Sequence, residues 1–324
     1  MDMIQKDSKI YIAGHNGMVG NALLRYFKKT GFKKIYFATK KSLNLLNQNK
    51  VENFIKLKKP DVIINCAGKV GGILANSTYP VEFLNDNIFI QLNLINSAYK
   101  NKVKHFINLG SSCIYPKNSK QPIKESYLLN SELEKTNEAY ALAKIVGLKA
   151  CSFYNKQFKT SYLTLMPCNL YGPNDNFNIK NSHFVPALIK KFSEAKKTKK
   201  KYVEIWGTGS PKREVMHVDD LASAVGFILK KKLSNNKKLA KHINSNSLIN
   251  VGSGQEFTIR EFANIINNLT SSYKILKFNK NYPDGTKRKV LDIRVMLKLG
   301  WKSKISLKKG LKDTIDWYTK EKTK

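Results

Sequence analysis

The sequence predicts an α/β fold in which a doubly wound parallel sheet carries a smaller C-terminal lobe. In the first half, short apolar runs alternate with amphipathic helical patterns, which indicates right-handed βαβ units. The runs VIIN at 62–65 and HFINL at 105–109 are almost uniformly apolar, as expected for strands that helices cover on both faces. After about residue 172, polar and loop-like segments become frequent, which indicates a change of architecture.

The predicted elements follow one another in a regular order. Strands are expected within segments 9–14, 33–38, 61–68, 104–112 and 160–173. Helices are expected within segments 17–31, 48–58 and 81–101, and after Asn137. In the second half, the lysine-rich stretch 190–201 is expected to be an exposed helix face, and Asp219 and Asp220 are candidate N-caps of the apolar helix that follows them.

The charge of the chain is strongly positive, with 58 basic and 23 acidic residues and a formal net charge of +35. Clustered cations would favour nucleic acid, because they release counterions from phosphates. However, only five of the basic residues are arginine, the side chain preferred for guanine edges and phosphate clamps, and the lysines are scattered over the whole chain. We therefore expect no nucleic-acid partner, and a solvated surface that attracts an anionic substrate.

The four cysteines form no CxxC pair and show no metal-like spacing with the five histidines. Neither a disulfide framework nor a metal site is expected, which fits a cytoplasmic location. The N-terminus lacks the basic and apolar regions of a signal peptide, and no apolar run approaches the roughly 18–20 residues that cross a bilayer. No membrane partner is expected.

The first chemical motif is GHNGMVG, which lies directly between a predicted strand and a predicted helix. Gly14 permits a tight turn, Gly17 lets a pyrophosphate approach the backbone, and Gly20 lets the helix pack closely on the strand. This context favours dinucleotide binding over an ordinary βα turn. Residues 1–172 are thus expected to form an NAD(P)-binding Rossmann domain, to which segments around 214–252 return, whereas residues 173–324 form mainly a substrate-binding domain.

The end of the second predicted strand bears on the choice of cofactor. It reads FATKK and has no acidic residue to bind the 2′-hydroxyl of NAD. Lys40 and Lys41 place positive charge there instead, which suits a 2′-phosphate. We therefore expect NADPH, with NADH as the less favoured alternative if the two lysines are ordinary surface residues.

Tyr140 and Lys144 in YALAK are four residues apart, so both side chains lie on one face of a helix. A tyrosine of ordinary pKa is a poor proton donor and acceptor at neutral pH, and a neighbouring ammonium is expected to lower that pKa. Ser111 and Ser112, at a predicted strand end, precede Tyr140 by 29 and 28 residues. Together with the glycine motif, this set resembles the extended short-chain dehydrogenase/reductases.

Longer stretches resemble a narrower family, the GDP-L-fucose synthases, over nearly the whole chain. They are AGHNGMVG, AGKVGGILANSTYP, LGSSCIYPK, TNEAYALAK, MPCNLYGPNDNF, NSHFVPALI, REVMHVDD and PDGTKRK. The resemblance implies an NADPH-dependent 3,5-epimerase and 4-reductase of GDP-4-keto-6-deoxy-D-mannose. It also implies a homodimer that pairs through helices of the main domain.

The resemblance assigns the catalytic residues as Ser111, Cys113, Tyr140, Lys144 and His183. The ketone at C4 acidifies the hydrogens at C3 and C5, and inversion needs a base on one face and a proton donor on the other. By resemblance, Cys113 and His183 take these roles in an order that the sequence leaves open, while the hydroxyls of Ser111 and Tyr140 hold O4. A buried thiol and a loop histidine are the alternative interpretation of these two residues.

The binding residues are implied in the same way. The cofactor set is Gly14, Asn16, Gly17, Met18, Val19, Gly20, Lys40, Lys41, Leu109, Gly110, Lys144, Pro167, Asn169, Leu170 and His183. The substrate set is Lys191, Trp206, Arg213, Asp284 and Lys289. The family usually has arginine at Asn16, Ala38 and Lys191, threonine at Cys168 and proline at Lys287, so Lys40 and Lys41 must supply the charge for NADPH.

Two other functions stay open. One is a related epimerase or reductase that acts on another GDP-4-keto-deoxy sugar, such as a deoxyheptose. The other is a basic nucleic-acid-binding protein on a reductase-like fold, which only the net charge of +35 suggests.

Overall fold

The structure is a computed structural model that describes residues 4–178, 182–231, 247–282 and 284–322. Its centre is a parallel six-stranded sheet in the order β2-β1-β3-β4-β5-β9. The strands are β1 (Ile10–Ala13), β2 (Ile35–Tyr36), β3 (Val62–Asn65), β4 (His105–Leu109), β5 (Tyr162–Pro167) and β9 (Leu248–Val251). The predicted doubly wound α/β fold is confirmed.

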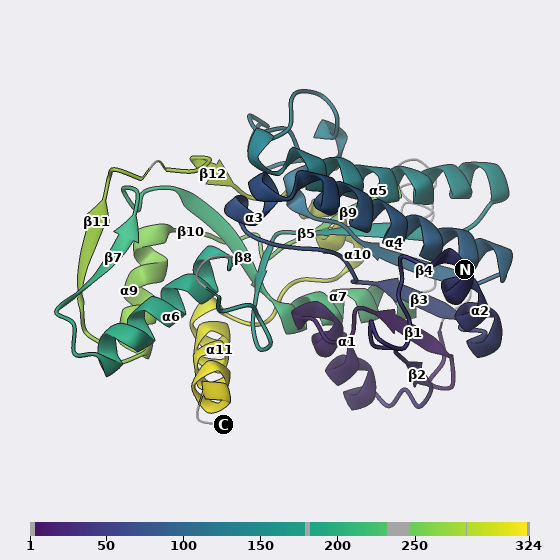
Figure 1. Cartoon of the computed structure of the whole chain (residues 1–324), viewed down its shortest axis with the longest axis horizontal. Coiled ribbons are helices and arrows are strands. Elements are labelled where there is room, and N and C mark those ends of the chain that lie inside the picture. The colour runs from purple at the N-terminus through teal and green to yellow at the C-terminus, as the bar shows by residue number, and fades with distance from the viewer. Residues whose placement is uncertain (1–3, 179–181, 232–246, 283, 323–324) are drawn as a thin grey trace.

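Helices cover both faces of this sheet (Figure 1). They are α1 (Met18–Lys29), α2 (Gln48–Lys58), α3 (Ile73–Thr78), α4 (Pro80–Lys100), α5 (Glu138–Phe158), α7 (Val218–Lys230) and α10 (Arg294–Leu299). Ile10 and Ile12 of β1 pack with residues of α1 and α7, whereas Tyr11 and Ala13 pack with residues of α2 and α4. Because side chains alternate along a strand, this division places apolar contacts on both sides of the sheet.

The smaller lobe has its own strands and core. Its strands are β6 (Asn169–Tyr171), β7 (Tyr202–Trp206), β8 (Lys212–His217), β10 (Glu256–Thr258), β11 (Ile275–Asn279) and β12 (Arg288–Lys289). Its helices are α6 (Phe184–Lys197), α9 (Ile259–Leu269) and α11 (Leu307–Lys322), and short 3-10 turns η1 (Ser112–Ile114), η2 (Glu125–Tyr127) and η3 (Lys135–Asn137) lie in the main domain. Of segment 214–252, β9 joins the large sheet and β8 the lobe, and residues 232–246 lie outside the described residues.

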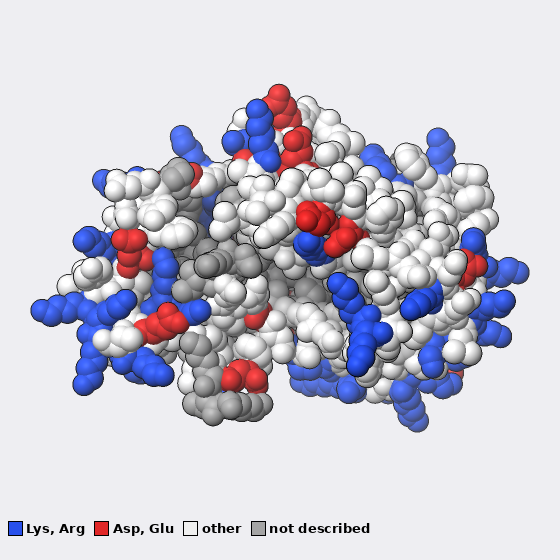
Figure 2. All heavy atoms as spheres, in the orientation of Figure 1, with Lys and Arg blue, Asp and Glu red and all other residues white. Residues whose placement is uncertain are grey.

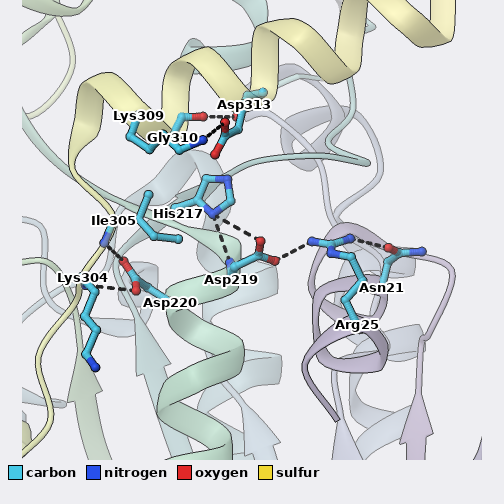
Figure 3. Close-up of polar contacts among 11 residues, drawn as sticks. Asn21, Arg25, His217, Asp219, Asp220, Lys304, Ile305, Lys309, Gly310 and Asp313 are labelled. Carbon is cyan, nitrogen blue, oxygen red and sulfur yellow. Dashed lines mark hydrogen bonds and ion pairs between the residues drawn. The ribbon is translucent and has the colours of Figure 1, made fainter. Parts of the chain in front are cut away.

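Polar contacts join the two parts where β8 leads into α7 (Figure 3). The N-cap of α7 is His217, whose Nδ1 accepts a hydrogen bond from the backbone N–H of Asp219 at 3.3 Å. The carboxylate of Asp219 pairs with Arg25 of α1 at 2.5 Å, and Asp220 accepts from the backbone N–H groups of Lys304 and Ile305. The prediction that Asp219 or Asp220 is the N-cap is therefore wrong, because both carboxylates bind other segments.

Glu214 of β8 connects its strand to two other segments of the chain through hydrogen bonds. It is 1% exposed, and its carboxylate accepts from the backbone N–H groups of Gly254 at 2.7 Å and Leu291 at 2.8 Å. Burial raises the pKa of Glu214 to about 7.

We expect Glu214→Ala to lower the free energy of unfolding by about 3–5 kcal/mol, because two buried donors lose their acceptors. Glu214→Gln should cost less, since its amide keeps one acceptor oxygen.

The folded-state pKa of Glu214 lies above its unfolded value, so the contribution of Glu214 to the free energy of unfolding is complete at low pH and is lost as the pH rises through 7. Denaturation between pH 5 and 8 should show the wild type losing stability relative to Glu214→Gln, and a pH-independent difference would contradict this.

A chain of buried amides lies beneath the C-terminal ends of β3 and β4. The Nδ2 of Asn65 donates to the Oδ1 of Asn108 at 3.0 Å, and the Nδ2 of Asn108 donates to the Oε1 of Gln91 at 3.1 Å. Gln91 on α4 in turn donates to the carbonyl of Ala143 on α5 at 2.9 Å. The chain ties two strands to two helices, one residue from Lys144.

Lysine and arginine side chains are spread over both ends of the face seen in Figure 2 and do not form one continuous patch there. Among the described residues, no helix is long and apolar enough to span a bilayer.

Candidate active site

A cavity of about 750 Å³ lies at the C-terminal ends of β1, β3, β4 and β5. In open parallel sheets, ligands bind at this edge, where the strand order reverses. Most of its lining residues lie within segments 14–20, 38–46, 66–71, 109–111, 167–170 and 174–176.

The glycine motif forms one wall of this cavity. Gly14 has a φ of +84°, and a Cβ there would lie 2.7 Å from the backbone of Ala67. A Cβ at Gly20 would lie 2.2 Å from the carbonyl oxygen of Gly14, so the helix can approach the loop only with glycine. A Cβ at Gly17 would meet only that same oxygen, at 3.6 Å. Gly17 is the N-cap of α1 and has no side chain to satisfy the first N–H groups, which leaves a cradle suited to a pyrophosphate.

The two lysines expected at the adenosine end differ in position. Lys40 lines the cavity together with Ala38, whereas Lys41 lies outside it. Asn16, Met18 and Val19 line the cavity beside the glycines.

Tyr140 and Lys144 face the cavity from the first two turns of α5. The Nζ of Lys144 lies 5.6 Å from the centroid of the Tyr140 ring and donates to the carbonyl of Leu109 at 3.0 Å. Burial lowers the pKa of Lys144 to about 8 and raises the pKa of Tyr140 well above its usual value. This direction is opposite to the lowering that the neighbouring ammonium led us to expect, because burial of the phenol is the largest effect on its pKa. A neutral phenol is nevertheless the form that can give a proton to a ketone oxygen.

Ser111 and Cys113 meet where β4 passes into η1. Ser111 is the N-cap of η1, and its Oγ lies 3.1 Å from the Sγ of Cys113. Ser111 also acts on Tyr140, since its hydroxyl lowers the pKa of the phenol and so partly offsets the effect of burial. Ser111 lines the cavity, whereas Ser112 is only 4% exposed and does not line it. The local turn thus distinguishes the two serines.

His183 approaches from the other lobe. It precedes α6, lines the cavity and makes no side-chain cap hydrogen bond. Burial, with the positive charge of Lys289, lowers the pKa of His183, so its imidazole is neutral near pH 7 and able to take a proton. The charge of Lys289 also acts on Cys113, so one ammonium lies near both predicted acid–base groups.

The segment after β5 completes the cavity with Pro167, Asn169 and Leu170, and Leu109 and Gly110 line it from β4. Cys168 is 6% exposed, and its thiol points to the carbonyl of Asn169.

The predicted substrate residues lie outside the cavity, in the smaller lobe. Lys191 donates to the carbonyl of Glu204 at 3.0 Å, and its Nζ lies 4.9 Å from the centroid of Trp206. Lys289 of β12 lies opposite Arg213 of β8 in the register of these two parallel strands. The charge of Arg213 interacts with that of Asp284. Of this substrate set, Lys289 is the residue whose charge acts on both Cys113 and His183.

Residues of the cavity wall that were missed from the sequence include His15 and Asp175. His15 lies against Phe37, with ring centroids 4.6 Å apart. Asp175 accepts from the N–H of Asn176 at 2.7 Å, but its buried Oδ2 has no partner among the described residues, and burial raises its pKa to about 7. Asp175 follows a Gly-Pro pair and reads as ordinary turn chemistry in the sequence.

Residues 10–246 match the family described as the NAD dependent epimerase/dehydratase family. The chain belongs to this family. Within it, GDP-L-fucose synthase 1 of Arabidopsis thaliana is 47% identical over 318 residues, 98% of this chain and 95% of the plant protein. The resemblance to the GDP-L-fucose synthases is thereby confirmed.

Solved structures of other epimerase/dehydratase-like proteins share the whole fold. A GDP-6-OMe-4-keto-L-xylo-heptose reductase from Campylobacter jejuni has a TM-score of 0.92 and 35% identity, and the match covers 99% of this chain and all of that one. MlghC, a GDP-mannoheptose C4 reductase from the same organism with NADP bound, has a TM-score of 0.87 and 36% identity, covering 98% and 99% of the two chains.

Proposed function

We propose that the protein is an NADPH-dependent epimerase and reductase that converts GDP-4-keto-6-deoxy-D-mannose to GDP-L-fucose. The observation that carries the proposal is the thiol of Cys113 3.1 Å from Ser111, which also acts on the pKa of the Tyr140 phenol. A reductase needs only the two hydroxyls, whereas a thiol beside them suits proton transfer next to the same ketone. The GDP-L-fucose synthase relative supports the choice of sugar.

The cavity residues fit a dinucleotide. The glycine loop offers backbone N–H groups at the start of a helix, and Lys40 offers charge at the adenosine end. Asn169 and Leu170 would lie beside the nicotinamide ring, and Lys144 would bind its ribose. NADPH, when bound, supplies the hydride for C4, and NADP bound to MlghC supports this choice.

The side chains of the protein carry out the proton transfers at C3, C5 and O4. Cys113 and His183 remove and return protons at C3 and C5. As a proton leaves, negative charge develops on O4, where the hydroxyls of Ser111 and Tyr140 stabilise it. During reduction, Tyr140 gives its proton to O4, and the neutral state of its phenol suits this direction.

The test is turnover in D₂O with GDP-4-keto-6-deoxymannose and NADPH. NADPH should be consumed, and mass spectrometry should find GDP-L-fucose with deuterium at C3 and C5. No turnover with either nicotinamide cofactor would refute the proposal. A reductase that does not epimerise would leave C3 and C5 unlabelled.

A second candidate is a reductase or epimerase of a GDP-4-keto-heptose. The match to the Campylobacter jejuni heptose reductase supports it. A higher kcat/KM on the heptose substrate than on the deoxymannose substrate would favour this candidate.

Lys40→Ala is expected to raise the KM for NADPH tenfold or more and to leave the KM for NADH unchanged. A hydrogen bond to a charged group contributes about 1.5–3 kcal/mol, which NADH lacks at this position. Lys41→Ala is the matched control, since Lys41 lies outside the cavity. Equal effects of the two substitutions would indicate general surface charge instead of a phosphate contact.

The homodimer belongs to the same proposal. Exposed apolar side chains on the outer faces of α4 and α5 support it, among them Phe89 at 52% and Phe153 at 63% exposure. Sedimentation of the full chain should give twice the monomer mass. The cytoplasmic location stays a prediction from the sequence.

A further inference from the structure

His217 carries a buried imidazole that the proposed chemistry does not use. It is the last residue of β8, is 2% exposed and is the N-cap of α7. Its Nδ1 accepts a hydrogen bond from the backbone N–H of Asp219 at 3.3 Å, and its Nε2 has no partner among the described residues. An N–H can donate only to an unprotonated ring nitrogen, so this geometry requires the neutral ring, with its hydrogen on Nε2.

The ring of His217 packs against β6 and the first turn of α11. Tyr171, the last residue of β6, lies opposite His217 in the parallel register of β6 and β8, and the two rings meet edge to face with centroids 5.5 Å apart. On the side of α11, a Cβ at Gly310 would lie 3.1 Å from the Cδ2 of His217. The absence of a side chain at position 310 therefore lets α11 approach the ring closely.

Both β6 and α7 continue from His217 to the cavity. Asn169 and Leu170, directly before Tyr171 on β6, line the cavity on the side assigned to the nicotinamide, and Leu221, in the first turn of α7, lines it as well. A capping side chain fixes the first turn of its helix by accepting from a backbone N–H that has no partner within the helix. The cap at Nδ1 and the packing on Tyr171 thus both act on this wall of the cavity.

The charged groups that face the ring come from three helices and from the segment before α11 (Figure 3). They are Arg25 of α1, Asp219 and Asp220 of α7, Asp313 of α11, and Lys304, which lines the same small cavity as the ring. Each carboxylate has another partner. Asp219 pairs with Arg25 at 2.5 Å. Asp313 pairs with Lys309 at 2.5 Å, and Asp220 accepts from two backbone N–H groups. Burial lowers the pKa of His217, and the three carboxylates offset only part of that effect.

A second proton on the ring would break the cap of α7. It would occupy Nδ1, which would then meet the N–H of Asp219 as another donor and turn to the Oδ2 of Asp219, now 3.9 Å away. The carboxylate of Asp219 would be shared with Arg25, whose helix α1 begins at the glycine loop. A charged ring is therefore incompatible with the arrangement that the neutral ring holds.

We propose that His217 is a positioning residue for cofactor binding: its neutral imidazole fixes the cavity wall formed by β6 and the start of α7, and protonation of the ring releases that wall. This inference rests on the proposed function, because it takes the ligand of the cavity to be NADPH or its oxidised form. His217 does not itself line the cavity and acts through Asn169, Leu170 and Leu221.

The experiment measures the Kd of NADP⁺ for the full chain by calorimetry at pH 7.5 and pH 5.5, independently of turnover. His217→Asn should bind like the wild type at pH 7.5, because its side-chain oxygen can accept the same N–H at either pH. At pH 5.5 the wild type should lose about fivefold more affinity than His217→Asn, the factor that corresponds to an ordinary N-cap. Protonation of the 2′-phosphate of the cofactor affects both proteins alike and cancels in this comparison.

His217→Leu removes the acceptor and should bind NADP⁺ about fivefold more weakly than the wild type already at pH 7.5. His105→Asn is the matched control. His105 is also buried, at 4% exposure, but it begins β4 at the end of the strand away from the cavity. This variant should keep the pH dependence of the wild type.

Two results would overturn the positioning role while the proposed function stands. One is a parallel loss of affinity in the wild type and His217→Asn at pH 5.5, and the other is wild-type affinity of His217→Leu at pH 7.5. Should His217→Leu fail to fold, the comparison with His217→Asn still decides. If the wild type does not bind NADP⁺ at either pH, the proposed function itself fails.

Discussion

Cys113→Ser is expected to lower kcat for GDP-L-fucose formation by about 10³-fold, because general acid–base catalysis contributes about 10²–10⁴ and a serine hydroxyl does not titrate near neutral pH. The serine keeps the size of the thiol and can still contact Ser111, so the cavity should stay intact. His183→Gln should give a loss of the same order. Deuterium uptake at C3 and C5 in D₂O, measured by mass spectrometry, reports this step apart from reduction.

Cys66→Ser provides the matched control for the thiol. Cys66 lines the cavity, but its thiol donates to the carbonyl of Ala13, and burial raises its pKa to about 12. A thiol with so high a pKa is almost entirely protonated near neutral pH and is therefore a poor base, so this variant should retain isotope uptake. Unchanged exchange in both Cys113→Ser and His183→Gln would refute their acid–base assignment, and NADPH binding should survive in both.

Tyr140→Phe is expected to lower the rate of NADPH oxidation by about 10³-fold, again within the range for general acid catalysis. In the proposed mechanism the phenol is the proton source for O4, and Ser111 cannot replace it without losing its own role. Stopped-flow absorbance at 340 nm measures the hydride step directly. Substrate and NADPH should still bind, because the ring remains.

Tyr115→Phe separates chemistry from stability. The hydroxyl of Tyr115 donates to the Oδ1 of Asn250 at 2.6 Å in the interior, close to Cys113 in the chain. Its loss should lower the melting temperature and leave kcat nearly unchanged. If Tyr115→Phe lost activity and Tyr140→Phe lost only stability, Tyr140 would not be the proton donor.

Features that depend on local spacing could be predicted from the sequence. The four-residue interval from Tyr140 to Lys144 places both on one face whatever the rest of the chain does, and the three glycines follow a strand directly. Features that depend on which segment comes to lie nearby could not. Asp219 reads as an N-cap, but Arg25, 194 residues away, binds its carboxylate.

The pKa shifts of the site residues could not be predicted from the sequence either. The interval from Tyr140 to Lys144 suggests a lowered phenol pKa, yet the depth of burial decides the direction, and burial is a property of the folded chain. Lys289 could be assigned to substrate by resemblance. Its position near both Cys113 and His183 follows only from the pairing of β12 with β8.

The buried amide chain from Asn65 to Gln91 has a consequence for cooperativity. Because it ties α4 and α5 to each other and to the sheet, the two helices cannot slide past one another without breaking several buried hydrogen bonds. If a second copy docks on the outer faces of these helices, ligand binding in one copy is not expected to reach the other through a shift of α4 against α5. We therefore expect Lys144 on α5 to keep its position, and the two sites of such a pair to bind ligand independently of each other.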